Sequence, residues 1–224
     1  MNRLIKSQAR NVRWQKRQVE PDILKKLQQE KKNMAIKLKA DLWFPSIVWA
    51  TLDLGADIAW LKQYADQLRH ADPQGENVSN SGGWQSRSVE WPEFREQSTP
   101  WELKKFKTQL DEAVGIAVKQ AGFPQLNLNN MWFNINGYKD HNMLHDHQGS
   151  LISGVVYTNV IDPDKMGNIE FHREDSAIHF IPPLDRYNHF TSQKGSYAPK
   201  DNLLLLFPSW LKHSVNSNMS KSER

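Results

Sequence analysis

The chain of 224 residues contains no cysteine. This absence excludes disulfide bonds, iron–sulfur clusters and zinc sites built on thiolates, and it fits a reducing cytoplasm. Long hydrophobic runs are also missing, since no stretch approaches the roughly 18 apolar residues of a membrane helix. The basic start of the chain lacks the apolar core and cleavage site of a secretory signal. We therefore expect a cytoplasmic protein with no membrane partner.

Charge is distributed unevenly along the chain. Residues 1–40 hold 12 Lys and Arg but only 3 Asp and Glu, which leaves 17 basic and 22 acidic residues for the rest. We predict a basic N-terminal extension over 1–40, helical or disordered, followed by one domain over 41–224. The extension is interpreted either as a solvated face or tail, or as a contact for nucleic acid or an acidic partner.

The first half of the domain contains two predicted helices and a predicted loop. An apolar run over 42–50 predicts a strand, and apolar residues recurring at helical spacing predict a helix over 56–70. Residues 71–83 are rich in Asp, Asn, Ser and Gly, which predicts a loop. A second helix is predicted over 101–121, because Gly122 follows it and a proline comes two residues later.

The second half of the domain has a residue pattern that is typical of β structure. Residues 130–136 alternate with a period of two. Further short β-rich runs, separated by turn residues, follow at 151–160, 168–172, 177–181 and 203–207. Strands about ten residues apart without intervening helices indicate an antiparallel sandwich or barrel. The sequence therefore predicts a mainly β fold, with the two helices bracing one face.

Residues able to bind a metal gather in the second half. His145, Asp146 and His147 are consecutive, and His213 follows 66 residues later. Side chains at positions i and i+2 of a strand point the same way, so the first and third of these residues can reach one metal. Iron(II) oxygenases use two histidines and one carboxylate on one face of the metal. Two alternatives follow: a three-histidine site, which strand geometry favours, or a local kink that makes Asp146 the anionic ligand.

An arginine, Arg224, stands eleven residues after His213. Its guanidinium group can bind a carboxylate through two hydrogen bonds and stays charged at physiological pH. It is interpreted as an anchor for an organic acid or as a solvated arginine.

Several segments occur in a characteristic order, and Gly-Trp-Gln-Ser combined with Phe-Pro-Ser-Trp-Leu-x-His is a specific combination. The segments are Leu-Trp-Phe-Pro at 42–45, Ser-Gly-Gly-Trp-Gln-Ser at 81–86, Trp-Phe-Asn-Ile-Asn-Gly at 132–137, the run 145–157, Gly-Asn-Ile-Glu-Phe at 167–171, and the run 206–215. In these segments the chain resembles the 2-oxoglutarate and iron(II)-dependent oxygenase superfamily, specifically a microbial and phage subfamily. The resemblance covers about residues 41–224.

This resemblance implies a double-stranded β-helix, a cupin-like jelly roll. It implies iron(II) as cofactor and 2-oxoglutarate as small-molecule co-substrate, with His145 and His213 as iron ligands and His147 at the position of the usual carboxylate. The implied activity is that of a dioxygenase, which hydroxylates an unidentified substrate and releases succinate and carbon dioxide. A phage-encoded member would act in the host cytoplasm.

The resemblance also implies residues for the co-substrate. Arg224 would hold the distal carboxylate of 2-oxoglutarate. Tyr157 lies on the strand that supplies a tyrosine to the same carboxylate in prolyl-hydroxylase-like relatives, and its alternative role is core packing. Asn134 and Asn136 precede the metal strand and are interpreted either as contacts for co-substrate or substrate or as structural residues at a strand edge.

The chain departs from these relatives in one further respect. Relatives continue past the arginine with another core strand, whereas this chain stops at Arg224. We expect a jelly roll without its last strand, with an exposed edge and an arginine that no strand fixes. Either the natural chain is longer or the protein is compromised. Together with His147, this departure supports a second hypothesis, a non-catalytic jelly-roll binding or structural module with a vestigial metal site.

Overall fold

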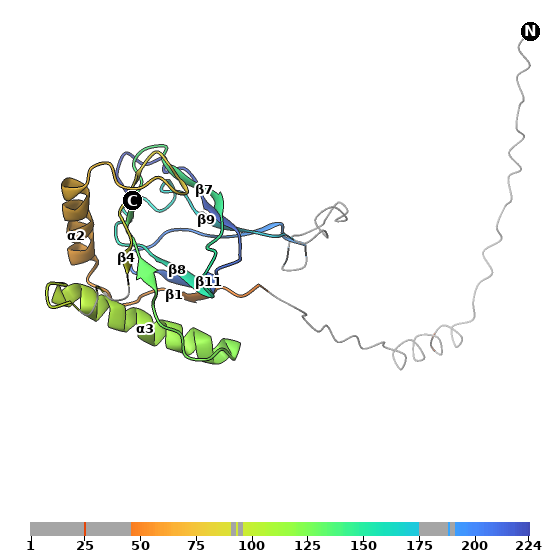
Figure 1. Cartoon of the computed structure of the whole chain (residues 1–224). Helices are drawn as coiled ribbons and strands as arrows, with labels where there is room; N and C mark the ends of the chain where they lie inside the picture. The colour runs from red at the N-terminus through yellow and green to blue at the C-terminus, as the bar shows by residue number, and fades with distance from the viewer. Residues whose placement is uncertain (1–24, 26–45, 91–92, 94–95, 175–187, 189–190) are drawn as a thin grey trace, which may run out of the picture. The chain divides into compact units, whose positions relative to one another are not determined.

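In a computed structural model of the chain, the described residues are 25, 46–90, 93, 96–174, 188 and 191–224. Apart from Lys25 they all belong to one compact unit, Ser46–Arg224, which is shown in Figure 1. The predictions for the basic extension 1–40 and for a strand over 177–181 fall outside these residues. Within the described residues, no helix is long and apolar enough to cross a membrane.

Both helices predicted for the domain are present. Helix α2 spans Ile58–Ala71, and the side chain of its N-cap residue, Asp57, accepts a hydrogen bond from the backbone N–H of Trp60 at 3.1 Å. Helix α3 spans Trp101–Ala121 and ends at Gly122, whose φ of 73° is the left-handed conformation that glycine adopts without steric cost. Local signals therefore fixed both helices.

The strands form antiparallel sheets, as the β texture of the sequence predicts. A five-stranded sheet has the order β10-β9-β12-β7-β2, and a three-stranded sheet has the order β1-β11-β8. The strands of the first are Asn80–Ser81 (β2), His141–His145 (β7), Ile169–His172 (β9), Lys194–Tyr197 (β10) and His213–Val215 (β12). Those of the second are Trp49–Thr51 (β1), Ile152–Val156 (β8) and Leu204–Pro208 (β11). The predicted mainly β fold with flanking helices, a jelly roll, is confirmed.

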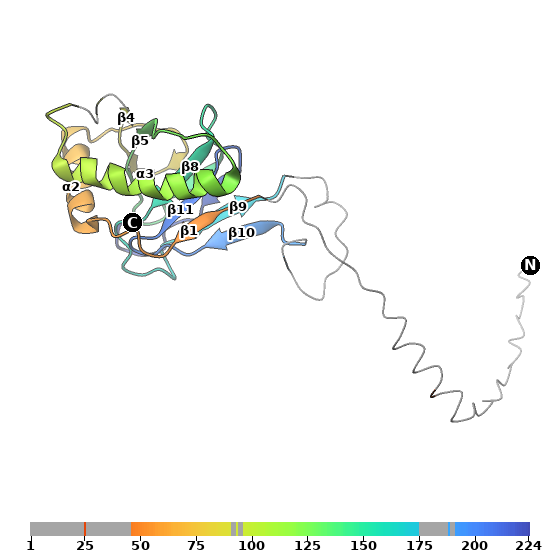
Figure 2. The ribbon, with the colours of Figure 1, turned by 90° about the horizontal axis from the view of Figure 1, so that it is seen from below.

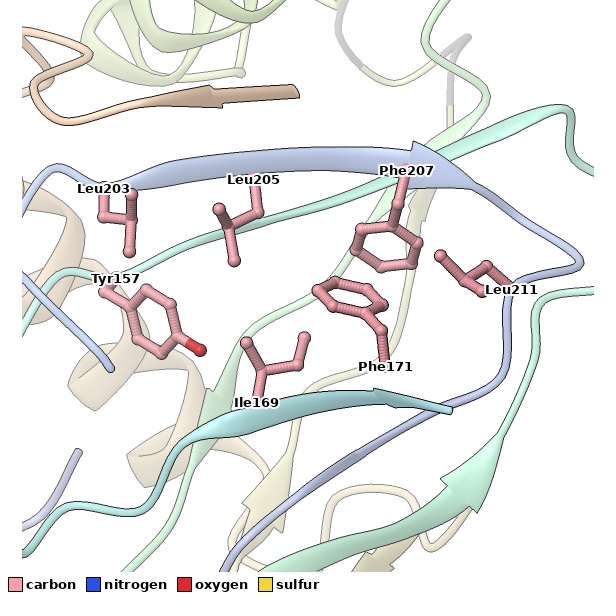
Figure 3. Close-up of a cluster of buried hydrophobic side chains, with 7 residues drawn as sticks. All are labelled: Tyr157, Ile169, Phe171, Leu203, Leu205, Phe207 and Leu211. Atoms are coloured by element: carbon pink, nitrogen blue, oxygen red, sulfur yellow. The ribbon is translucent and has the colours of Figure 1, made fainter. Parts of the chain in front are cut away.

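The main core lies between these two sheets. Alternate side chains along β11 point into the interior and are almost fully buried. These are Leu205 and Phe207, together with Leu203 just before the strand. They meet Ile169 and Phe171 of β9 from the facing sheet, as Figure 3 shows. The period of two along one strand therefore fills the interior of the jelly roll.

The helices cover the outside of the three-stranded sheet. Leu204 and Leu206, which alternate with the inward residues of β11, pack against Ala117 of α3. Figure 2 shows α3 lying across this sheet. Helix α2 packs against α3 through Leu61 and Phe106. The expectation that the two helices brace one face is met.

Some predicted elements are shorter or broken in the structure. The strand predicted over 130–136 is two short strands, Asn130–Met131 (β5) and Asn134–Ile135 (β6), which pair with Val89–Glu90 (β4) and Trp84–Gln85 (β3). Ser86 makes the break, because its backbone N–H and its hydroxyl oxygen both bond to the backbone of Phe133, at 2.9 and 3.0 Å. The loop predicted over 71–83 likewise contains strand β2.

Candidate metal centre

Two of the candidate ligands face each other across neighbouring strands. His145 is the last residue of β7 and His213 is the first residue of β12, and the two are partners in the antiparallel register. Their ring centroids lie 4.3 Å apart. The sheet therefore brings together two histidines that are far apart in the sequence.

The third histidine comes from a loop and not from the strand. β7 ends at His145, so the expectation that His145 and His147 lie at i and i+2 of one continuous strand is wrong. The backbone N–H of His147 donates to the carbonyl of Ser209 at 2.9 Å. This bond ties the loop to the chain that leads into His213. As a result the ring of His147 lies 5.0 Å from each of the other two rings and 5.5 Å from the ring of Trp132.

The three histidines offer ligand atoms that converge. One nitrogen from each of His145, His147 and His213 lies within 4.8 Å of the others. Among the described residues, these three histidines are the side chains that form a converging group of three or more potential metal ligands. Asp146 does not belong to this group. The observed geometry thus favours the three-histidine alternative over a carboxylate ligand.

Hydrogen bonds set the proton positions on two of the rings. Nδ1 of His145 lies 2.7 Å from the carbonyl of Met143, and Nδ1 of His213 lies 2.9 Å from the carbonyl of Leu211. A carbonyl can only accept, so each Nδ1 carries a proton, and in the neutral ring this leaves the lone pair on Nε2. Such a bond is the usual outer support of a metal-binding histidine.

Burial also keeps the rings of His147 and His213 neutral. It lowers the pKa of His147 to about 4, helped by repulsion from His145. Burial lowers the pKa of His213 to about 4 as well, again with repulsion from the neighbouring histidines. Neutral imidazole is the form that binds a metal, so little proton release is needed at neutral pH.

Arg224 is fixed in the fold, contrary to the expectation that no strand holds it. Its backbone N–H and C=O exchange two hydrogen bonds of 2.9 Å with the backbone of Asn136. Its Nη1 donates to the carbonyls of Met166 and Gly167, the latter at 2.8 Å. In the described part of the chain these are the bonds of the guanidinium, so Nη2 and Nε remain available to a ligand.

Tyr157 lies within the range over which the charge of this arginine acts. Its side chain is 6% exposed, and its hydroxyl group has no hydrogen-bond partner among the described residues. Burial raises the pKa of Tyr157 to about 12, while the positive charge of Arg224 opposes this shift. A buried polar group normally has a partner, so a buried hydroxyl group without one is an unusual feature that a bound anion would explain.

The core connects this hydroxyl group to the histidines. Tyr157 belongs to the same buried cluster as Phe171 and Phe207, and Figure 3 shows it at the end of the cluster away from these two rings. The ring of His213 lies 4.7 Å from that of Phe207 and 6.0 Å from that of Phe171. The interior of the jelly roll is therefore bounded by the arginine and tyrosine at one end and by the histidines at the other.

Asn134 lies apart from these groups. It is exposed on β6, where it pairs with Gln85 of β3, and within the described residues no hydrogen bond joins it to Tyr157 or Arg224. Asn136, two residues later, is 2% exposed and pairs with Arg224. The sequence analysis missed this pairing, because alternation along a strand does not name the partner.

Comparisons with known proteins agree with the resemblance seen in the sequence. Residues 130–224, which include all three histidines, Tyr157 and Arg224, match the model of the family described as "Putative 2OG-Fe(II) oxygenase". A comparison with curated proteins gave no match.

Two solved structures share the fold. A prolyl-4-hydroxylase from Pseudomonas putida has a TM-score of 0.55 and 14% identity, over 79% of this chain and 87% of that one. SnoK, a non-heme alpha-ketoglutarate-dependent carbocyclase from nogalamycin biosynthesis, has a TM-score of 0.55 and 12% identity, over 79% of this chain and 76% of that one. The match of residues 130–224 to the family model bears out the resemblance seen in the sequence, and the two solved structures show that the fold is shared.

Proposed function

We propose that the protein is an iron(II)- and 2-oxoglutarate-dependent dioxygenase that hydroxylates a substrate and releases succinate and carbon dioxide. The observation that carries this proposal is the convergence of one nitrogen each from His145, His147 and His213 within 4.8 Å. Imidazole nitrogen is a common ligand of iron(II), and three such ligands leave coordination positions open. Bound iron(II) with 2-oxoglutarate supplies the oxidising chemistry, in which one atom of oxygen goes to the co-substrate and the other to the substrate.

The three histidines contribute a preformed ligand set that contains no carboxylate. Because the carbonyls of Met143 and Leu211 hold the Nδ1 protons of His145 and His213, the rings cannot rotate without losing a hydrogen bond. With no carboxylate among the three ligands, they neutralise none of the charge of the metal. The dianionic co-substrate then balances a divalent cation on its own.

Arg224 and Tyr157 form the other half of the proposed site. Nη2 and Nε of the arginine would donate to the distal carboxylate of 2-oxoglutarate. The tyrosine hydroxyl group would donate a further bond, because a pKa of about 12 keeps it protonated at physiological pH. The tyrosine is buried and the arginine is half-buried, and a charged hydrogen bond is stronger in such surroundings than in water.

An anaerobic titration tests this proposal. Iron(II) and then 2-oxoglutarate are added to the protein, and the weak visible charge-transfer band of the complex is followed. We expect the band with the unaltered protein and with His70→Ala, an exposed histidine on α2, and no band with His213→Ala. After admission of oxygen, the unaltered protein should form succinate from 2-oxoglutarate.

The outcomes separate the two functional hypotheses. A folded protein that gives no band, or a band unaffected by His213→Ala, would contradict the proposed enzyme. A folded protein that binds neither metal nor co-substrate would support the non-catalytic jelly-roll module with a vestigial site.

A further inference from the structure

We propose that the ion pair between Arg69, on helix α2, and Glu223 positions Arg224. Through this positioning the ion pair sets the affinity of the site for 2-oxoglutarate. This inference rests on the proposed function, because it assumes that Arg224 binds the distal carboxylate. It assigns a role to two residues that lie outside the metal centre and outside the co-substrate contacts.

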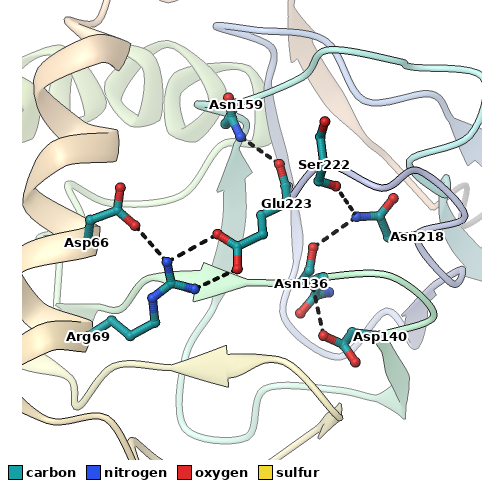
Figure 4. A network of polar contacts seen from close by, with 9 residues as sticks. Asp66, Arg69, Asn136, Asp140, Asn159, Asn218, Ser222 and Glu223 are labelled. Atoms are coloured by element: carbon teal, nitrogen blue, oxygen red, sulfur yellow. Dashed lines mark hydrogen bonds and ion pairs between the residues drawn. The ribbon is translucent and has the colours of Figure 1, made fainter.

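The first observation is the geometry of the ion pair. Nη1 and Nη2 of Arg69 bind the two carboxylate oxygens of Glu223, at 2.8 and 3.1 Å, which is the two-bond arrangement with the most defined geometry. Asp66, one turn earlier on α2, accepts a further bond from Nη2 at 2.9 Å. Figure 4 shows Arg69 between the two carboxylates. The guanidinium of Arg69 is therefore held on α2 by Asp66, and it can in turn hold the side chain of Glu223.

The second observation is that Glu223 directly precedes Arg224. The side chain of Glu223 reaches outward to α2, while that of Arg224 is turned into the fold towards Met166 and Gly167. The carbonyl of Glu223 also accepts a bond from the side-chain amide of Asn159. Glu223 is therefore held by its side chain and by its backbone.

The third observation concerns the other side of the same segment. The backbone of Arg224 pairs with Asn136, and the side chain of Asn218 donates to the carbonyls of Asn136 and Ser222, at 2.9 and 2.8 Å. Figure 4 shows Asn218 between Asn136 and Ser222, close to the ion pair. Residues 222–224 are thus clamped between α2 and the chain around Asn136. With the backbone held on both sides, the bonds of Nη1 to the carbonyls of Met166 and Gly167 restrain the side chain of Arg224 as well.

The exposure of the ion pair indicates positioning and not global stability. The side chains of Arg69 and Glu223 are 32% and 50% exposed, and ion pairs at such sites contribute little to the stability of a fold. Their effect on placement can be larger, since a small displacement of a ligand-binding group costs affinity steeply. The pair joins residues 154 positions apart, whereas Lys107 and Asp111 form a pair within α3. This second pair provides a matched control.

The first test needs neither metal nor co-substrate. Hydrogen exchange of the backbone amides of Asn136 and Arg224 is measured in the metal-free protein, in Arg69→Ala, in Glu223→Ala and in the double variant. We expect exchange about tenfold faster in each single variant, with little further change in the double variant, because both changes remove one interaction. The control Asp111→Ala should exchange as the unaltered protein does.

The second test measures binding. In the anaerobic titration, we expect Arg69→Ala and Glu223→Ala to raise the Kd of 2-oxoglutarate by roughly tenfold and to leave the Kd of iron(II) unchanged. At saturating 2-oxoglutarate, kcat should be retained while KM for 2-oxoglutarate rises. A loss caused only by a weakened fold would instead affect iron(II) binding and kcat as well.

The outcomes distinguish this inference from the proposed function. An unaltered protein that binds 2-oxoglutarate, with variants that bind it equally well, would overturn the inference alone. An unaltered protein that does not bind 2-oxoglutarate would overturn the proposed function and the co-substrate role inferred here. Unchanged amide exchange in both single variants would overturn the positioning of Arg224 in either case.

Discussion

The backbone of Arg224 exchanges two hydrogen bonds with the backbone of Asn136, each 2.9 Å long. This exchange is one rung of an antiparallel ladder, and it places the arginine against the segment that leads into β7. The same β7 ends with His145, a candidate metal ligand. The proposed anchor for the distal carboxylate and the candidate metal centre are thus connected through one short stretch of chain.

The identity of the third metal ligand can be tested by two substitutions. We expect His147→Ala to lower the affinity for iron(II) by about 100-fold or more, because loss of even an outer partner of a ligand costs 10- to 100-fold. We expect Asp146→Ala to leave the affinity unchanged, because Asp146 is not among the converging groups. Anaerobic calorimetric titration with iron(II) measures both values. The reverse order of effects would establish the carboxylate alternative.

Local pattern was enough to predict much of the fold. The helices followed from apolar residues at helical spacing and from Gly122 at the end of α3. The alternation along β11 placed Leu205 and Leu206 on opposite faces, one in the core and one against the helix. In such elements the pattern is set by neighbours a few residues away, which a sequence displays directly.

Other features depended on distant partners and could not be predicted. Strand β10, Lys194–Tyr197, is polar and forms because it pairs with β9. Arg69 and Glu223 carry no local signal, since their partnership depends on the packing of α2. For the site, sequence spacing named His145 and His213, but the loop position of His147 follows from a backbone bond to Ser209. Long-range hydrogen bonds thus set the details of the site.

Asn218 should be important for stability. It is fully buried, and its side chain donates to the carbonyls of Asn136 and Ser222 and accepts from the backbone N–H of Ser220. We expect Asn218→Ala to lower the free energy of unfolding by about 1–3 kcal/mol, because it leaves buried groups without partners. Urea denaturation measures this change. The exposed Asn127→Ala should stay within about 0.5 kcal/mol of the unaltered protein, and an equal loss in both variants would contradict the prediction.

Two glycines should respond to alanine with opposite signs. Gly167 has a φ of 76°, and a Cβ there would lie 2.1 Å from the carbonyl oxygen of Asn216, so Gly167→Ala should cost about 1–3 kcal/mol. Gly115 lies within α3 with open space around it, so Gly115→Ala should stabilise by about 0.5–1 kcal/mol. Thermal unfolding of the two variants checks the signs. Destabilisation by Gly115→Ala would contradict the packing described for α3.

Tyr157→Phe should raise stability and lower affinity for 2-oxoglutarate. The hydroxyl group of Tyr157 is buried without a partner, so its removal should stabilise the metal-free protein by about 1 kcal/mol. The same removal takes a hydrogen bond from the distal carboxylate and should raise the Kd of 2-oxoglutarate by roughly tenfold. Urea denaturation and the anaerobic titration measure the two effects. A loss of stability with unchanged affinity would assign Tyr157 to core packing alone.

The stability difference between the unaltered protein and Tyr157→Phe should also grow with pH. Burial raises the pKa of Tyr157 from its usual value of 10.0 to about 12, so the folded state disfavours the ionised form. The stability tied to this group is therefore fully present below about pH 10 and is lost as the pH rises through about 12. Phenylalanine has no such ionisation, and Tyr64, whose pKa is also raised, is present in both proteins. Urea denaturation of the metal-free proteins at about pH 8 and about pH 11 should thus show a larger difference at the higher pH. An equal difference at both values would mean that the hydroxyl group ionises as readily in the fold as in water, which contradicts the effect of its burial.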